Sequence, residues 1–187
     1  KAVLRAYANI LPEQVKGKGF LIRGCTPLEE RYVGNAFVFS EKLKKKVLKT
    51  YNGSISFTER TKDIYAQAGD YTMLQKMQHC DLYTWLPSDI LVKGDRLSMA
   101  HSLEARVPYL DKEVFKAARE LADEDKLKNG TTKYILRDAF ADLLNKETVV
   151  RPKLGYPVPV RAWLKDELYD WAANIIKNST ATEYIDS

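Results

Sequence analysis

Charged residues stand at helical intervals in the stretch LPSDILVKGDRLSM, which occupies positions 86–99. On a helix, Asp89, Lys93 and Arg96 fall at i, i+4 and i+7, so their side chains form one polar stripe. Such a stripe presents a carboxylate and two cations to a charged substrate. Periodicity alone favours the alternative of a solvated face, on which Asp89 and Lys93 make a weak surface pair.

A second charged pair lies in SLEARVPYLD, at positions 102–111, where Glu104 and Arg106 alternate with apolar residues. A spacing of two is not that of a helix face, and in an extended segment it points both side chains the same way. The pair is either a buried structural ion pair or one wall of a pocket for a charged substrate. Asp111 is explained as the N-cap of the next helix.

The third stretch is RPKLGYPVP, at positions 151–159, where Lys153 follows a proline on a loop between two helices. The prolines reduce the conformational freedom of this loop, and its glycine permits a sharp turn. A lone lysine on a loop is usually solvated. A lysine held on a loop this constrained is better suited to meeting a phosphate group.

Other residues that often do chemistry have simpler explanations here. His79 and His101 are lone histidines, which are more often structural than catalytic. Cys80 lies in an apolar helical pattern and is expected to fill the core. Cys25 has no evident activating base, and the chain lacks the cysteine and histidine spacing of a zinc site, so no metal site is predicted.

The apolar residues between these stretches repeat at helical spacing, and nothing resembles a series of alternating strands, so the predicted fold class is mainly α. Residues 13–26 and 148–159 are expected to be loops because of their glycines and prolines. The first expected helix ends at Pro12, and a short one begins at Pro27. The next three are capped by Ser40, Thr58 and Asp70 and run to Tyr51, Gly69 and Leu86. Pro87 is expected to interrupt the last of these, and Ser88 to cap a helix from Asp89 to about His101. Two more helices follow caps at Asp111 and Thr131, and one helix over residues 160–176 closes the chain.

The composition is that of a globular protein, with 187 residues, of which 45% are hydrophobic. The net charge of +5 is mildly basic, since 30 lysine and arginine residues exceed 25 aspartate and glutamate residues. A basic helical module that binds nucleic acid is therefore one alternative. The positively charged surface that such a module needs is weak here, because the densest basic run, Lys42 to Lys49, occupies a single helix face.

Several features concern the compartment and extent of the protein. Two cysteines without zinc spacing fit a reducing, cytoplasmic location. No apolar run approaches the ~18 residues of a membrane span, and the first residues are not a signal peptide, so no membrane partner is expected. The chain begins without methionine in the middle of a helical pattern, which suggests a piece of a longer protein.

Three blocks together resemble the asparagine synthetase family, in the family's order: residues 81–111, 130–140 and 151–164, of which the second reads GTTKYILRDAF. The match is strongest over residues 81–165. The resemblance implies that residues 1–187 are the C-terminal fragment of the family's synthetase domain. That domain is an adenine-nucleotide α-hydrolase-like (PP-loop ATPase) fold, and the fragment is expected to be its helical portion without the parallel sheet.

The resemblance also implies a reaction. ATP and Mg²⁺ activate the side-chain carboxylate of aspartate as β-aspartyl-AMP, and ammonia from an N-terminal glutaminase domain then gives asparagine and AMP. ATP and Mg²⁺ are expected to bind mainly to segments outside residues 1–187, which contain no glycine-rich phosphate loop. The fragment is therefore expected to be inactive alone, and to self-associate or dimerise through exposed apolar surface. An alternative is a related synthetase that closes β-lactam rings or amidates peptides or sugars.

Residue roles follow from the resemblance as expectations. Lys153 would stabilise negative charge near the α-phosphate, and Glu104 and Asp89 would place carboxylates near the substrate amine or the attacking ammonia.

The remaining expected roles concern binding and the loop. Arg106 and Arg96 would balance the carboxylates, and Asp95 competes with Asp89 for the position that faces the substrate. Residues expected to position the lysine loop are Arg151, Gly155 and Tyr156.

Overall fold

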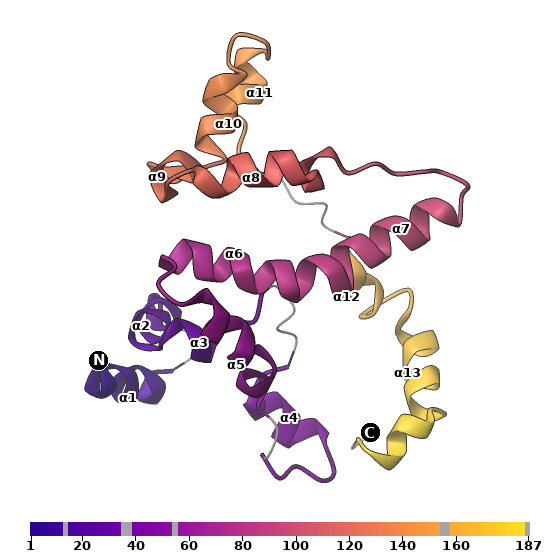
Figure 1. The fold of residues 1–187 in the computed structure, drawn as a ribbon. Coiled ribbons are helices and arrows are strands. Elements are labelled where there is room, and N and C mark those ends of the chain that lie inside the picture. The colour runs from indigo at the N-terminus through magenta and orange to yellow at the C-terminus, as the bar shows by residue number, and fades with distance from the viewer. Residues whose placement is uncertain (13–14, 35–38, 54–55, 154–157, 186–187) are drawn as a thin grey trace. The chain divides into compact units, whose positions relative to one another are not determined.

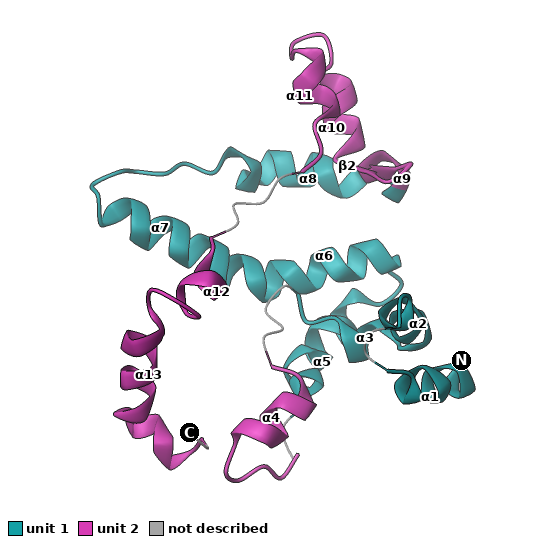
Figure 2. Ribbon diagram, turned by 180° about the vertical axis from the view of Figure 1, so that it is seen from behind, with its two compact units in different colours: residues 1–38, 55–123 teal, residues 39–54, 124–187 magenta. Residues whose placement is uncertain are grey.

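The computed structural model describes residues 1–12, 15–34, 39–53, 56–153 and 158–185. Two compact units make up the chain (Figure 2): unit 1 comprises residues 1–38 and 55–123, and unit 2 comprises residues 39–54 and 124–187. Both units are mainly helical, as the sequence predicts (Figure 1). The one sheet among the described residues is a two-stranded hairpin in unit 2.

Unit 1 consists of short helices. Helix α1 packs against α2, α3 packs against α5, and α5 packs against α6. The elements are α1 (Ala2–Ile10), α2 (Lys18–Cys25), α3 (Leu28–Arg31), α5 (Phe57–Ala68), α6 (Met73–Tyr83), the π-helix η1 (Leu86–Leu91), α7 (Val92–Met99), the 3-10 helix η2 (Pro108–Leu110) and α8 (Lys112–Glu120). Helix α9 (Asp123–Lys126) lies where the chain passes from unit 1 to unit 2.

Helix α2 corrects the prediction of a loop over residues 13–26. Gly17 adopts a φ of 90°, which turns the chain so that α2 starts directly after it. The glycines inside the helix each cost about 1 kcal/mol in helix propensity. Packing against α1 supplies tertiary contacts that propensity does not measure, and such contacts provide most of the stability of short helices.

The start of α5 and that of α6 each differ from the sequence prediction by two residues. Ser56, not Thr58, caps α5, because its hydroxyl accepts the backbone N–H of Thr58. Thr72, not Asp70, caps α6 through a capping box with Gln75. In both cases two polar residues compete for one cap, and the backbone conformation of the connecting turn decides between them.

The α-helix ends before Pro87, as predicted, but at Tyr83 rather than Leu86, and the chain turns at Thr84. The π-helix η1 follows, with Pro87 in its first turn, and leads directly into α7. A proline costs little there, because its missing N–H needs no partner in a first turn. The predicted cap at Ser88 is wrong, since Ser88 lies inside η1 and its N–H bonds to the Thr84 carbonyl at 3.3 Å.

The core of unit 1 is a small cluster in which Leu28, Tyr65 and Cys80 are buried. Tyr32, Ile64 and Met77 pack against this cluster, the last two from α5 and α6. The prediction that Cys80 fills the core is confirmed, and burial raises the pKa of its thiol.

Two tyrosines connect the cluster through hydrogen bonds. The Tyr32 hydroxyl donates to Asp81 Oδ2 at 2.7 Å, and the Tyr65 hydroxyl donates to the Tyr32 carbonyl at 2.8 Å. Burial, followed by the bond to Asp81, raises the pKa of Tyr32 well above its usual range. Burial also raises the pKa of Asp81, although the bond from Tyr32 opposes that shift. The cluster therefore favours a protonated Tyr32 phenol.

Gly34 approaches this hydrogen-bonded group closely. It is buried, its φ is 74°, and a Cβ in its place would lie 2.7 Å from Asp81 Oδ1 and 3.0 Å from Thr84 Oγ1. Asp81 Oδ1 is itself buried and has no hydrogen-bond partner in the described part of the chain. A Cβ at this position would require the side chains of Asp81 and Thr84 to move, and the positive φ also favours glycine.

Unit 2 combines two separate parts of the sequence: residues 39–54, which contain helix α4, and the C-terminal third of the chain. Its β1 and β2 pair antiparallel across Asn129 and Gly130, both of which have positive φ. The elements are α4 (Glu41–Val47), β1 (Leu127–Lys128), β2 (Thr131–Thr132), α10 (Tyr134–Ala139), α11 (Lys146–Val150), α12 (Val160–Trp163), α13 (Tyr169–Lys177) and the 3-10 helix η3 (Thr180–Glu183).

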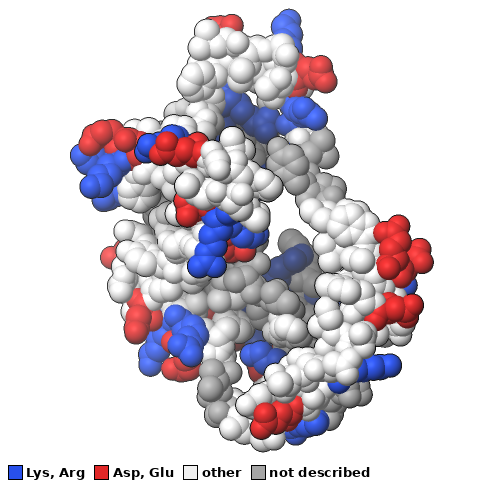
Figure 3. Space-filling model, turned by 90° about the vertical axis from the view of Figure 1, so that its right-hand side faces the viewer, with Lys and Arg blue, Asp and Glu red and all other residues white. Residues whose placement is uncertain are grey.

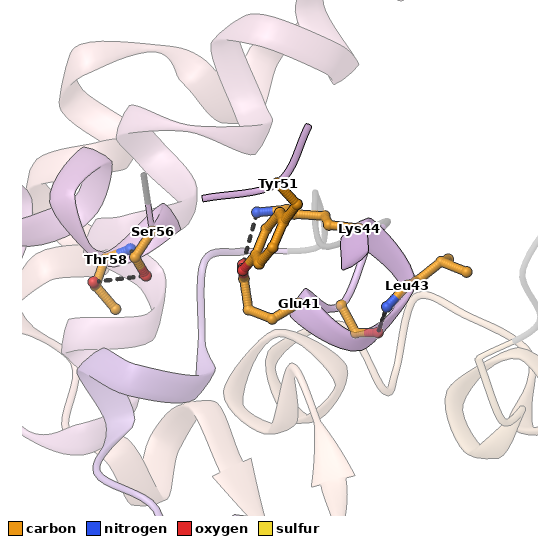
Figure 4. Close-up of polar contacts among 7 residues, drawn as sticks. Glu41, Leu43, Lys44, Tyr51, Ser56 and Thr58 are labelled. Atoms are coloured by element: carbon orange, nitrogen blue, oxygen red, sulfur yellow. Dashed lines mark hydrogen bonds and ion pairs between the residues drawn. The ribbon is translucent and has the colours of Figure 1, made fainter. Parts of the chain in front are cut away.

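Helix α4 begins at the cap that the sequence predicts. The Ser40 hydroxyl accepts the Leu43 N–H at 3.2 Å (Figure 4). The helix ends at Val47 rather than Tyr51, because the chain there becomes extended and bonds to the C-terminal segment, with the Lys49 N–H donating to the Tyr184 carbonyl at 3.0 Å. Leu48 also pairs with Ile185 in an isolated bridge. A long-range contact thus sets the end of a local element.

Three further predictions in unit 2 need correction. Thr131 does not cap α10 but lies in β2, and Lys133 with a φ of 57° precedes that helix. The helix expected over residues 160–176 is divided into α12 and α13, because the turn between them breaks the helical hydrogen bonds, and the Leu168 N–H bonds to the Trp163 carbonyl at 2.7 Å. The loop expected from residue 148 begins later, since α11 continues to Val150.

Both units expose many large apolar side chains, including Leu97, Tyr109, Leu143 and Trp171. Unit 2 also has a mainly apolar hollow of about 460 Å³ beside α13. The residues that line it are Leu164, Tyr169, Ala172, Ala173, Ile176 and Lys177. None of the described helices has the length and apolar character that crossing a membrane requires. The apolar surface is of the kind that packs against other protein.

Replacing Gly34 by alanine is expected to destabilise unit 1. The positive φ costs about 1 kcal/mol and the contact with Asp81 adds about 1–3 kcal/mol. Gly17→Ala is the matched control, because Gly17 has a φ of 90° and no atom would lie within 4 Å of a Cβ added there. Urea unfolding should rank Gly34→Ala below Gly17→Ala in stability, and equal losses would contradict the close approach.

Tyr32→Phe is expected to lower the free energy of unfolding at neutral pH by about 1–3 kcal/mol, because Asp81 loses its donor. The raised pKa of Tyr32 means that folding retains a proton that the unfolded chain releases above pH ~10. Stability from this group is therefore present below that pH and is lost as pH rises further. Tyr32→Phe should lose less stability at alkaline pH than the parent chain does. Tyr109→Phe, at an exposed site, is the control and should leave the free energy of unfolding unchanged.

Candidate functional site

Asp89 lies in η1 and accepts two partners through the same oxygen. The Trp85 indole N–H donates to Asp89 Oδ2 at 3.0 Å, and Lys93 Nζ lies 3.0 Å from that oxygen. The structure thus confirms the predicted surface pair of Asp89 and Lys93. It adds Trp85, which restricts the carboxylate and which the sequence pattern did not single out.

Asp95 and Arg96 are adjacent on α7, and both are exposed. Neighbouring residues on a helix point about 100° apart, so only one of them can continue the Asp89 stripe. Lys93 and Arg96 are three residues apart and share a face, which leaves Asp95 beside that face rather than on it. The geometry therefore favours Asp89 over Asp95 as the carboxylate of the stripe.

Glu104 and Arg106 form an ion pair on the irregular segment between α7 and η2. Their side chains are 70% and 83% exposed, so the alternative of a buried structural ion pair is wrong for this chain. An exposed pair adds at most about 1 kcal/mol to stability. The pair therefore contributes little to holding the fold.

Lys153 lies in unit 2, on the segment that follows α11, and its side chain is exposed. Arg151 begins this segment as the C-cap of α11. Gly155 and Tyr156 fall outside the described residues. The role of Lys153 near the α-phosphate stays a prediction.

Arg137, on α10, is a residue that the sequence reasoning missed. Its guanidinium donates to three backbone carbonyls: Nε to Thr132 at 3.1 Å, and Nη1 to Val149 at 2.6 Å and to Arg151 at 3.0 Å. It thereby connects the hairpin, α10 and the start of the Lys153 segment. The signal that pointed to it was its place inside the block GTTKYILRDAF.

The basic run of α4 is largely engaged in local contacts. Lys44 pairs with Glu41 at 2.7 Å, and Glu41 also accepts the Tyr51 hydroxyl (Figure 4). Lys45 Nζ lies 5.7 Å from the Tyr51 ring centroid. Lys49 Nζ donates to the Thr182 carbonyl. Basic and acidic side chains are interspersed over the face drawn in Figure 3. A footprint for nucleic acid gains no support from these contacts.

Within the described ranges, no three histidine, cysteine, aspartate or glutamate side chains come together as metal ligands. What the described residues do supply is cationic and anionic side chains on exposed segments.

The profile of the asparagine synthase family matches residues 5–187. This match covers nearly the whole chain, and the chain belongs to the asparagine synthase family.

Individual relatives agree with this assignment. The chain is 48% identical to the glutamine-hydrolyzing asparagine synthetase 1 of Bacillus subtilis over 185 residues, which are 99% of this chain and 29% of that relative. A putative glutamine-hydrolyzing asparagine synthetase from Mycobacterium bovis is 45% identical over 177 residues, which are 94% of this chain and 27% of the relative. The human glutamine-hydrolyzing asparagine synthetase is 41% identical over 69 residues, which are 35% of this chain and 12% of that protein. No solved structure matches the chain.

Proposed function

We propose that this chain is the helical C-terminal part of an ATP-dependent amidoligase of the PP-loop type. The reaction joins aspartate, ATP and ammonia to give asparagine, AMP and pyrophosphate. Ammonia comes from glutamine in a separate glutaminase domain. The 187 residues contribute a lysine loop and a set of charged side chains to the synthetase site.

The observation that carries this proposal is the 48% identity to the Bacillus subtilis synthetase across 99% of the chain. The aligned region spans all three blocks that contain the charged candidates. The names of the relatives favour aspartate as the acceptor over the carboxylates used by ring-closing or peptide-amidating synthetases. The chain spans 29% of that relative, so the remaining parts of the site lie on other segments.

Lys153 is assigned to the α-phosphate. Attack of the aspartate carboxylate on ATP brings two anions together, and a new P–O bond forms as the bond to pyrophosphate breaks. A cation placed beside the phosphoryl oxygens lowers the cost of that approach. Its effect is greatest in the transition state, where negative charge is most concentrated, and this makes the contact catalytic.

Glu104 and Asp89 are assigned to the nitrogen side of the reaction. A carboxylate beside the substrate α-amine binds its positive charge, and a carboxylate beside ammonia accepts the proton released as the C–N bond forms and AMP leaves. Arg106 and Arg96 balance these carboxylates, with Asp95 beside them. Exposure of Glu104 and Arg106 leaves both groups available to a substrate.

Lys153→Ala in the full-length protein is expected to lower the rate of pyrophosphate release by about 10²–10³-fold, because one transition-state cation is lost. Stability should stay within about 0.5 kcal/mol, because the side chain is exposed. Pyrophosphate release in the presence of aspartate and ATP measures the effect. Lys165→Ala is the control, as it removes another exposed lysine of unit 2. Near-normal turnover of Lys153→Ala would refute the assignment of Lys153 to the α-phosphate.

The isolated 187-residue chain is expected to make no asparagine and to hydrolyse no glutamine, because the phosphate-binding segments are not among its residues. Incubation with aspartate, ATP, Mg²⁺ and either glutamine or ammonia, followed by amino-acid analysis, measures this. Asparagine formation by the isolated chain would refute the proposed division of the site. A panel of carboxylate acceptors on the full-length protein separates aspartate from the other acceptors.

A further inference from the structure

Arg137 makes three charge-assisted hydrogen bonds to backbone oxygens, and all three acceptors belong to unit 2. Two of them, the Val149 and Arg151 carbonyls, stand at the C-terminal end of α11. The third, the Thr132 carbonyl, lies in the hairpin just before α10. The side chain is half-buried, and its bond to the Val149 carbonyl is partly shielded from water, whereas the other two bonds are exposed.

The end of α11 needs such a donor. The last four carbonyls of a helix have no partner within the helix, and they carry the negative end of the helix dipole. α11 has only five residues and would be marginal without an external partner. A guanidinium is suited to this position because its planar fork donates several hydrogen bonds in fixed directions.

The same contact determines how the chain leaves α11. Arg151 and Pro152 are the only residues between the last turn of α11 and Lys153, and proline fixes its own φ near about −65°. Pro152 also restricts the backbone of Arg151 to extended conformations. A fixed Arg151 carbonyl therefore leaves few backbone rotations before Lys153, and the guanidinium of Arg137 sets the starting direction of that lysine.

We propose that Arg137 is a positioning residue for Lys153: it anchors the C-terminal end of α11 to the hairpin and so holds the lysine segment in the orientation that the adenylation step uses. The proposal rests on the proposed function for its catalytic consequence. The anchoring itself concerns only residues of this chain and can be tested without activity.

Hydrogen exchange in the full-length protein tests the anchor. In Arg137→Ala, the amides of Val149, Val150 and Arg151 should exchange roughly fivefold faster, because the last turn of α11 loses its donor. Arg137→Lys keeps the charge but not the planar fork, so its exchange rates should lie between those of the parent chain and those of Arg137→Ala. Arg119→Ala, an exposed arginine of α8, is the control and should leave these amides unchanged. Unaltered exchange in Arg137→Ala would overturn the proposal.

Turnover of the full-length protein tests the link to Lys153. Arg137→Ala should lower kcat for pyrophosphate release by at least about tenfold while the KM for ATP changes less than about twofold. In the double variant with Lys153→Ala, kcat should equal that of Lys153→Ala alone, because an anchor for an absent lysine has nothing to position. A purely structural role would instead multiply the two losses, and that result would overturn the proposal.

The two experiments separate the possible failures. If Lys153→Ala alone keeps near-normal turnover, the proposed role of Lys153 fails, and the positioning role of Arg137 fails with it. The exchange result then still shows whether Arg137 anchors α11. If Lys153→Ala is impaired and Arg137→Ala is not, the proposed function stands and the positioning role is wrong.

Discussion

The hydrogen bond from the Tyr32 hydroxyl to Asp81 connects the N-terminal helices of unit 1 to α6. It matters beyond the core, because α6 is followed, after a turn at Thr84, by η1 and α7, which carry Asp89, Lys93 and Arg96. The core around it is small, so one partly buried, charge-assisted bond is a large share of what fixes α6. Gly34 closes over the same carboxylate and leaves no room for a side chain.

Unit 2 uses a comparable arrangement with the opposite charge. Arg137 gathers three backbone carbonyls from segments on either side of it in sequence, and so joins the hairpin, α10 and α11. In both units a single polar side chain connects short elements that bury little apolar surface. The candidate site residues themselves are largely exposed and bind the fold weakly.

The sequence predicted the helical class, the caps at Ser40 and Asp111 and the Asp89–Lys93 pair, because each depends on neighbours within one or two helical turns. It failed where distant segments decide. The glycine-rich residues 18–25 form a helix because α1 lies against them, and α4 ends early because the C-terminal segment pairs with Leu48. Arg137 was missed for the same reason, since its acceptors lie up to 14 residues away.

By itself the sequence determined the family, the mainly helical character and the short list of charged candidates, since residue types and their local spacing carry that information. Only the tertiary structure decided that Glu104 and Arg106 are exposed rather than buried, that Trp85 shares Asp89, and that Arg137 holds the segment before Lys153. Burial and long-range hydrogen bonds depend on which segments meet when the chain folds. That outcome is set by the packing of the whole unit, and no local pattern contains it.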